Sequence, residues 1–294
     1  MKDQTLLQIA NSLSVNVQRL TSPGLLEGKM GVAVFLYHYA KYSGRVAYGY
    51  QADSLMDEII ASVSDTQLSF SNGLSGIGWG IRHFLKENFI RADDDLLTYL
   101  DNNMIQYIKQ HTDENMLDSC MYLTFGNPEL LDDRLMTFLA KQLFLFLPSG
   151  SHSLATLNKL LAVANHLPGR YLHPWYDILL NDAIQAIKIR QYRLSDLMIC
   201  SELLEKLHGK ERYQAWKALH DRCKSLISTG ISQTDRIETV WQNLVLSGGA
   251  VKDRHDVNWI STYVTDKLKD LNIPDLCFSA GLPALGIRLL MVSD

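Results

Sequence analysis

Three glycine-rich phrases that each lead into an apolar stretch constrain the fold of this chain more than any other feature. The phrases are GLLEGKMG (residues 24–31), GLSGIGWG (residues 73–80) and GLPALG (residues 281–286). In each phrase, small residues are followed at once by a run with the hydrophobic spacing of a helix. A phrase that recurs in this way indicates a repeated helical unit, and a repeat determines the architecture before other features do.

The spacing of the phrases predicts seven repeats. Gly28 and Gly76 lie 48 residues apart, and Gly73 and Gly281 lie 208 residues apart, which is five periods of about 42 residues. This period has the length of a helix-turn-helix unit in helical repeat arrays. Eroded copies that fit the period lie at residues 117–120, 149–154, 194–200 and 246–249.

Nearly every stretch of the chain has helical spacing, and the stretches alternate in kind. A stretch that follows a glycine phrase, such as residues 32–42, is apolar around most of its circumference, which predicts a helix buried on most sides. The next stretch, such as residues 51–63, has one apolar face and one polar face. We see no convincing alternating strand and no low-complexity linker. The pattern predicts an all-α chain in which residues 1–294 form a single domain.

Alternating inner and outer helices fit either a double-layered toroid or an open solenoid. The ends of a solenoid are usually atypical caps, whereas here the first and last copies of the phrase are the best ones. This difference favours the toroid, with seven hairpins preferred over six.

The composition is that of a soluble globular protein, with 47% apolar and 20% charged residues. The formal net charge of −4 argues against a general nucleic-acid binder. The first residues break up every apolar run with polar ones, so we expect no signal peptide, no membrane span and a cytoplasmic location. The four cysteines are widely spaced and form no C-x-x-C pair, which predicts free thiols.

The first two phrases resemble the lanthionine synthetase C-like family, especially its Bacteroidetes-type members. The main resemblance covers about residues 22–100, with an echo at residues 276–291. It implies an (α/α)7 toroid. It also implies a cyclase, in which a zinc ion held by two cysteines and one histidine turns a cysteine of a substrate peptide into a thiolate. That thiolate adds to a dehydrated serine or threonine and closes a thioether ring.

The chain lacks both motifs that carry the zinc ligands of this family, Trp-Cys-x-Gly and Cys-His-Gly. We therefore carry over no ligand and expect no cofactor. A relocated zinc site is an alternative, because Cys120, Cys200, Cys277 and His152 all fall close to expected starts of inner helices. Free cysteine usually packs as a small hydrophobe, and no pair here has short ligand spacing, so simple burial is the favoured interpretation.

Five residues are candidates for lining the cavity of a toroid. They are Trp79, Arg82, His83 and His38, which lie in or just after the two best phrases, and His152, which falls near an expected start of an inner helix. A satisfied pair in the core is the competing interpretation for such residues. Residues 24–31 resemble a phosphate-binding loop only superficially, since Met30 stands where Ser or Thr would hold magnesium and no strand precedes it.

The predicted function is that of a lanthionine synthetase C-like protein without the zinc site. It would be an accessory, peptide-binding component of lantibiotic-like biosynthesis, with a precursor peptide or a peptide-modifying enzyme as its partner. Three alternatives stay open: an active thioether cyclase with a relocated metal site, a glycan-acting toroid enzyme, and a helical-repeat scaffold. The glycan-acting enzyme would need two carboxylates about 5–10 Å apart, and the scaffold a large exposed apolar patch.

Overall fold

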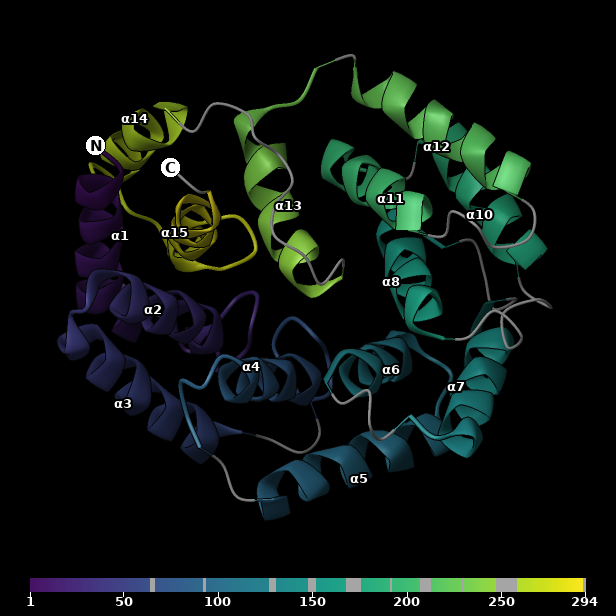
Figure 1. The fold of residues 1–294 in the computed structure, drawn as a ribbon, viewed down its shortest axis with the longest axis horizontal. Helices are drawn as coiled ribbons and strands as arrows, with labels where there is room; N and C mark the ends of the chain where they lie inside the picture. Colours follow the sequence, from purple (N-terminus) through teal and green to yellow (C-terminus); the bar gives the residue numbers. More distant parts are fainter. Residues whose placement is uncertain are drawn as a thin grey trace. The chain divides into compact units, whose positions relative to one another are not determined.

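The fold is all-α throughout the part of the chain that the computed structural model describes. That part comprises residues 1–63, 67–91, 94–126, 131–147, 152–167, 176–190, 192–206, 213–228, 230–246 and 258–292. These residues form fourteen α-helices, two short 3-10 helices at Val17–Arg19 and Ile273–Leu276, and no strand (Figure 1). The predicted fold class is therefore confirmed. None of the described helices has the length and hydropathy needed to cross a bilayer.

One series of helices follows the predicted repeat. Among the described residues it comprises α2 (Lys29–Ser43), α4 (Leu74–Lys86), α6 (Glu114–Gly126), α8 (Leu154–His166), α11 (Leu194–Lys206), α13 (Gln233–Val245) and α15 (Leu282–Met291). Consecutive helices of this series start 39 to 49 residues apart, in agreement with the predicted period. They are buried on most sides; in α2, for example, every residue from Met30 to Tyr37 is buried. We call them the buried helices.

A second series alternates with the buried helices along the chain. Its members are α1 (Lys2–Asn16), α3 (Val46–Ser62), α5 (Asp94–Gln110), α7 (Asp133–Phe146), α10 (Tyr176–Lys188), α12 (Tyr213–Ile227) and α14 (Asn258–Lys267). In α3 the buried residues are Ala52, Leu55, Met56 and Ile59, which are three or four residues apart and share one face. Helices α1 and α7 also bury one face, so the predicted alternation is confirmed for these helices.

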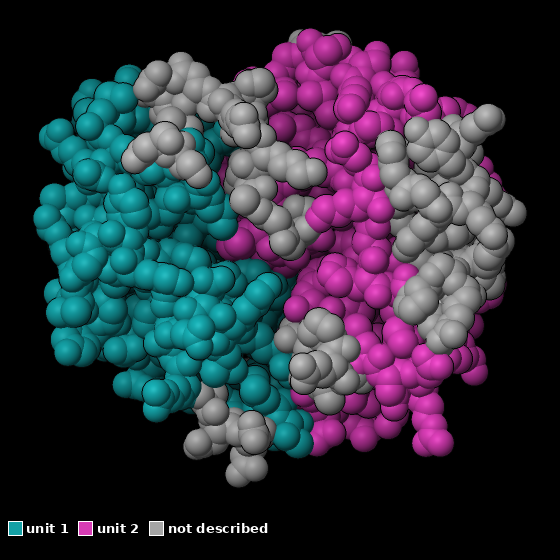
Figure 2. All heavy atoms as spheres, in the orientation of Figure 1, with its two compact units in different colours: residues 1–100, 249–294 teal, residues 101–248 magenta. Residues whose placement is uncertain are grey.

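The chain divides into two compact units, which Figure 2 colours separately. Unit 1 contains residues 1–100 and 249–294, and unit 2 contains residues 101–248. In unit 1, α15 packs against α1 and α2, and α2 packs against α3 and α4. The two ends of the chain therefore meet, as the well-formed terminal phrases predicted. In unit 2, α8 packs against both α6 and α11, and α11 packs against α13. The single domain and the closed toroid stay predictions.

The three glycine phrases build the same kind of helix start. Gly28, Gly73 and Gly281 are the N-caps of α2, α4 and α15, and each has an extended backbone. In the first two phrases the first helical N–H group donates to the carbonyl seven residues earlier: Lys29 to Ser22 at 3.0 Å and Leu74 to Gln67 at 2.8 Å. The chain thus folds back tightly onto each of these caps before its helix begins.

Equivalent residues that precede the three N-cap glycines also hydrogen-bond to one another. The N–H of Ser279 donates to the carbonyl of Leu26, and the N–H of Leu26 donates to the carbonyl of Ser71, both at 2.9 Å. Each of these residues lies two positions before the N-cap glycine of its phrase. The repeated phrases therefore lie side by side in unit 1, with the last phrase next to the first.

The four predicted copies in the middle of the chain agree with the observed helix starts in some cases and not in others. Helix α11 starts at Leu194, as residues 194–200 predicted, and α8 starts within the range 149–154. Residues 117–120 lie inside α6 instead of at its start. Of residues 246–249 the structure describes only Leu246, which is the C-cap of α13, so the copy expected there stays a prediction. Helix α13 itself begins after a capping box at Ser232. Residues 148–151 and 247–257 lie outside the described part.

Candidate functional site

The structure brings together three of the predicted cavity residues in unit 1. The Trp79 ring stacks on the His83 ring, with centroids 5.0 Å apart and planes 6° apart. The Nε2 atoms of His83 on α4 and His38 on α2 are 2.8 Å apart. Arg82 is half-buried on the same helix as His83. The two imidazoles therefore form a histidine pair that links neighbouring buried helices.

The histidine pair is held in its neutral form. The pKa of His38 and the pKa of His83 are both lowered to about 4, mainly by burial. For His83, the charge of His38 is the second cause of this lowering. The charged groups around the pair are Glu87, which opposes this shift, and Lys41 and Lys86, which reinforce it. Two neutral imidazoles form one N–H···N bond, in which one ring donates and the other accepts. This geometry matches the competing interpretation, in which the two histidines satisfy each other's hydrogen bond in the core.

Acidification is expected to destabilise the folded chain through this histidine pair. An unfolded histidine takes up a proton near pH 6.5, whereas the folded pair stays neutral down to about pH 4. The free energy of unfolding should therefore fall with decreasing pH, by about 1 kcal/mol per imidazole at pH 5.5. Urea unfolding across this pH range measures the loss. The double variant His38→Phe, His83→Phe should flatten the pH dependence, whereas His111→Gln, at an exposed position, should preserve it.

The other predicted ligands each have a local structural role. His152 Nε2 lies 3.1 Å from the carbonyl oxygen of Leu147, and its ring stacks on Phe146. Burial raises the pKa of the Cys120 thiol, which donates to the sulfur of Met116 at 3.6 Å.

The remaining cysteines are also buried free thiols, as predicted. A hydrogen bond with Cys223 and burial raise the pKa of Cys200. Burial raises the pKa of Cys277 to about 11. In the part of the chain that the structure describes, no three His, Cys, Asp or Glu side chains gather in a metal-binding arrangement. The predicted alternative of a Cys/His cluster therefore finds no geometry to support it among these residues.

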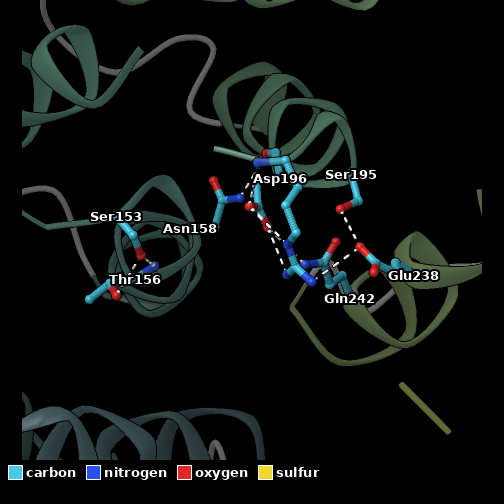
Figure 3. Close-up of polar contacts among 8 residues, drawn as sticks. Ser153, Thr156, Asn158, Ser195, Asp196, Glu238 and Gln242 are labelled. Carbon is cyan, nitrogen blue, oxygen red and sulfur yellow. Dashed lines mark hydrogen bonds and ion pairs between the residues drawn. The ribbon is translucent and has the colours of Figure 1, made fainter. Parts of the chain in front are cut away.

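Unit 2 contains a group of polar residues, four of them buried, that join three buried helices (Figure 3). We call it the polar cluster; it comprises Asn158 on α8, Arg193, Ser195 and Asp196 at the start of α11, and Glu238 and Gln242 on α13. Ser195, Asp196, Asn158 and Gln242 are each at most 2% exposed. Polar side chains are costly to bury unless they are paired, so the contacts of this cluster account for its presence in an apolar interior.

Asp196 lies at the centre of the polar cluster. Its Oδ2 accepts from the backbone N–H of Arg193 at 3.0 Å and from Nε at 3.3 Å, and its Oδ1 accepts from Nη2 at 3.2 Å. Gln242 Nε2 donates to Oδ1 at 3.4 Å. Asn158 Nδ2 donates to the backbone carbonyl of Asp196 at 2.8 Å. One carboxylate thus caps the start of α11 and links it to α13, while the carbonyl of the same residue links it to α8.

Arg193 bridges the two carboxylates of the cluster. Its Nη1 lies 3.1 Å from Glu238 Oε2, which also accepts from the Ser195 hydroxyl at 2.8 Å. Burial alone would lower the pKa of Arg193, but its contacts with Asp196 and Glu238 outweigh this effect and raise it. A guanidinium has five N–H donors, and these contacts use three of them. The side chain is 54% exposed, so the guanidinium is also accessible to an acceptor on a ligand.

Two buried acceptors of the cluster have no hydrogen-bond donor among the residues that the structure describes. They are Oδ1 of Asn158 and Oε1 of Gln242. Such orphaned oxygens are uncommon in buried positions and each calls for a physical reason. Each amide donates one hydrogen bond to Asp196, while its oxygen is shielded from solvent, so a donor could reach these oxygens only after the side chains around them move.

Further polar contacts join α6 to α8 in the same unit. Lys159 Nζ lies 2.6 Å from Asp118 Oδ1, and the Asp118 side chain is only 5% exposed. The hydroxyl of Thr156 donates to Glu114 Oε1 at 3.0 Å. Like the polar cluster, these contacts join neighbouring buried helices of unit 2 through polar side chains.

The polar cluster suits binding better than glycoside hydrolysis. A glycoside hydrolase needs one of its paired carboxyl groups to carry a proton. Here both carboxylates are bound by the Arg193 guanidinium, and the Asp196 side chain is only 4% exposed. The cluster combines an exposed donor, Arg193, with buried amide acceptors. A peptide backbone carries the matching groups, carbonyl acceptors and N–H donors.

Sequence reasoning missed the polar cluster, although one signal was present. Asp118 and Asn158 are both the fifth residue of a buried helix and lie 40 residues apart. A polar residue that recurs with the period of the repeat, inside a stretch otherwise apolar, indicates a paired buried contact. A search restricted to cysteine, histidine and glycine does not detect this recurring polar residue.

Comparisons with known proteins identify no relative of this chain. No family model, no curated protein and no solved structure matches it. The polar cluster is the candidate functional site, because it alone among the sites described above joins an accessible donor to buried, unpaired acceptors.

Proposed function

We propose that this chain is a lanthionine synthetase C-like protein that binds a peptide without cyclising it. It would serve modified-peptide biosynthesis in the cytoplasm, together with a precursor peptide or a peptide-modifying enzyme. The alternation of buried and amphipathic helices with a period near 40 residues supports this proposal, as do the three glycine-capped helix starts. Closure of the buried helices into an (α/α)7 toroid is part of the same proposal.

The observation that carries the binding role is the pair of orphaned amide oxygens beside Arg193. A peptide backbone alternates N–H donors and carbonyl acceptors. Arg193, which is exposed, would donate to a carbonyl or a carboxylate of the peptide. Oδ1 of Asn158 and Oε1 of Gln242 are buried, so they would accept from peptide N–H groups once the covering side chains move aside. A cluster already linked by hydrogen bonds loses little conformational entropy when such a ligand binds.

The state of the thiols supports binding without zinc-thiolate chemistry. A zinc ligand or a nucleophile must be a thiolate, and thiolate formation is favoured near positive charge and opposed by apolar burial. Burial and neighbouring acidic groups raise the pKa of Cys120 and of Cys277, the latter to about 11. These cysteines are therefore suited to packing rather than to metal binding.

Peptide selection followed by binding measurements tests the proposal. Peptides would be selected on the wild-type protein from a display library of short random sequences, and their affinities measured by fluorescence anisotropy. Arg193→Ala should weaken binding about tenfold or more, because it removes the accessible donor. Arg193→Lys keeps the charge but loses the fork of the guanidinium, so its affinity should be intermediate.

Two controls make this experiment decisive. Arg222→Ala removes an exposed arginine of α12 in the same unit and should leave affinity unchanged. Unchanged melting temperatures would show that the Arg193 variants fold. Equal affinity in all variants, or no selected peptide, would contradict the binding site. Ring closure in a dehydrated, cysteine-containing peptide supplied with zinc, detected as loss of an alkylatable thiol, would establish the cyclase alternative instead.

A further inference from the structure

A pocket of about 480 Å³ lies in unit 1, where α2, α3 and α4 meet the segment that follows α4. Its apolar lining includes Met56 of α3, Ile81 of α4, and Phe89 and Ile90 of the following segment. Ile81 and Met56 are only 2% and 6% exposed, so the pocket reaches down to the core. Its size falls within the range of pockets that hold small organic ligands. None of its residues belongs to the polar cluster.

The polar groups of this pocket are mainly acidic. Asp53 and Asp57 are exposed on α3, and they lie four residues apart on one face of the helix. Like charges at this spacing repel each other, and a bound cation would relieve the repulsion. Among the lining residues that the structure describes, Arg91 is the one positively charged group. These described residues therefore give the lining a net charge of −1, from two carboxylates and one guanidinium.

A buried tyrosine orients one of the two carboxylates. The Tyr37 hydroxyl donates to Asp53 Oδ1 at 2.6 Å, and the Tyr37 side chain is almost fully buried. Burial, followed by the hydrogen bond and charge of Asp53, raises the pKa of Tyr37, so the phenol stays protonated and keeps donating. A carboxylate accepts more than one hydrogen bond, so Asp53 can bind a ligand while it holds Tyr37.

We propose that this pocket binds an organic cation with an apolar stem, an alkylammonium of the kind found in lysine side chains and free amines. The stem would lie against Met56, Ile81 and Phe89, and the ammonium would lie between Asp53 and Asp57. The apolar floor disfavours a fully hydrated inorganic ion, and the two carboxylates disfavour an anion. The site is separate from the polar cluster, and its test does not depend on peptide binding there.

Isothermal titration with matched probes tests the charge requirement. The n-hexylammonium ion should bind, whereas 1-hexanol should bind at least about fivefold more weakly and hexanoate more weakly still. Asp53→Asn and Asp57→Asn are isosteric changes at exposed positions, and each should weaken n-hexylammonium binding about threefold to fivefold. Arg91→Gln removes the opposing charge and should strengthen it. Asp221→Asn, at an exposed position of α12 in unit 2, should change nothing.

The source of the cation is distinguished by a second probe. Binding of Nα-acetyl-lysine N-methylamide, with the same dependence on Asp53 and Asp57, would identify a lysine side chain as the ligand. Binding of n-hexylammonium without it would identify a free amine. The proposal is overturned if 1-hexanol binds as tightly as n-hexylammonium, if Asp57→Asn and Asp221→Asn have equal effects, or if n-hexylammonium does not bind.

Discussion

Replacing Gly76 by alanine is expected to destabilise unit 1 by about 3 kcal/mol or more. A Cβ atom at this position would overlap the backbone carbonyl oxygen of Phe70 and press on the Cβ of Leu25. A backbone carbonyl cannot rotate away as a side chain can, so the segment before α4 would have to shift. That segment contains Ser71, whose carbonyl accepts from the N–H of Leu26 just before α2. The strain should therefore spread to α2. Urea unfolding monitored by circular dichroism measures the loss.

Two further glycines test whether close approach is the cause. Gly31 occupies the same place in the first phrase, where a Cβ would overlap the Leu25 carbonyl oxygen and the Phe278 side chain, so Gly31→Ala should be similarly damaging. Gly49 lies within α3, where an added Cβ would have the Cβ of Ala40 as its nearest neighbour, at 3.8 Å. Gly49→Ala should stabilise the protein by about 0.5–1 kcal/mol. Equal effects at Gly76 and Gly49 would refute the close-approach argument.

The same close approach explains which helix starts could be predicted from the sequence. Where the chain folds back onto its own helix, as before α4, only glycine fits and the sequence shows it. Helix α13 begins without glycine, because the Ser232 hydroxyl and the Asp235 carboxylate satisfy its first N–H groups in a capping box. The first turn of α6 is capped by Asp113, which accepts from the N–H of Met116 at 2.9 Å. Starts that rest on a side-chain cap have no glycine to mark them, so the period alone placed them unevenly: it located α8 and α11 but put the start of α6 inside the helix.

The candidate site was less predictable than the fold because its residues acquire a role only through partners on other helices. In the sequence, Asp196 is one of many acidic residues near a helix start, where capping explains it fully. Its burial, and its contact with Gln242 some 46 residues away, follow from the packing of α11 against α13. Trp79 and His83 could be chosen from sequence because they follow a glycine phrase. Their pairing with His38 required the neighbouring helix.

Replacing Lys159 by methionine is expected to destabilise unit 2 by about 3 kcal/mol. Methionine preserves most of the apolar stem, so the main loss is the ammonium that lies 2.6 Å from Asp118. The Asp118 side chain is 5% exposed, and its charge would remain in the interior without this ion-pair partner. Urea unfolding measures the loss. Lys141→Met removes an exposed lysine of α7 in the same unit and should change the free energy of unfolding by less than about 0.5 kcal/mol.

A double-mutant cycle separates the buried charge from simple loss of packing. Asp118→Asn removes the charge with little change of shape. If the uncompensated carboxylate causes the damage, then Lys159→Met combined with Asp118→Asn should be more stable than Lys159→Met alone. Additive losses would instead mean that the two side chains contribute independently. Recovery in the double variant would show that Lys159 and Asp118 act as a unit between α8 and α6, because the damage comes from a carboxylate that has lost its ion-pair partner.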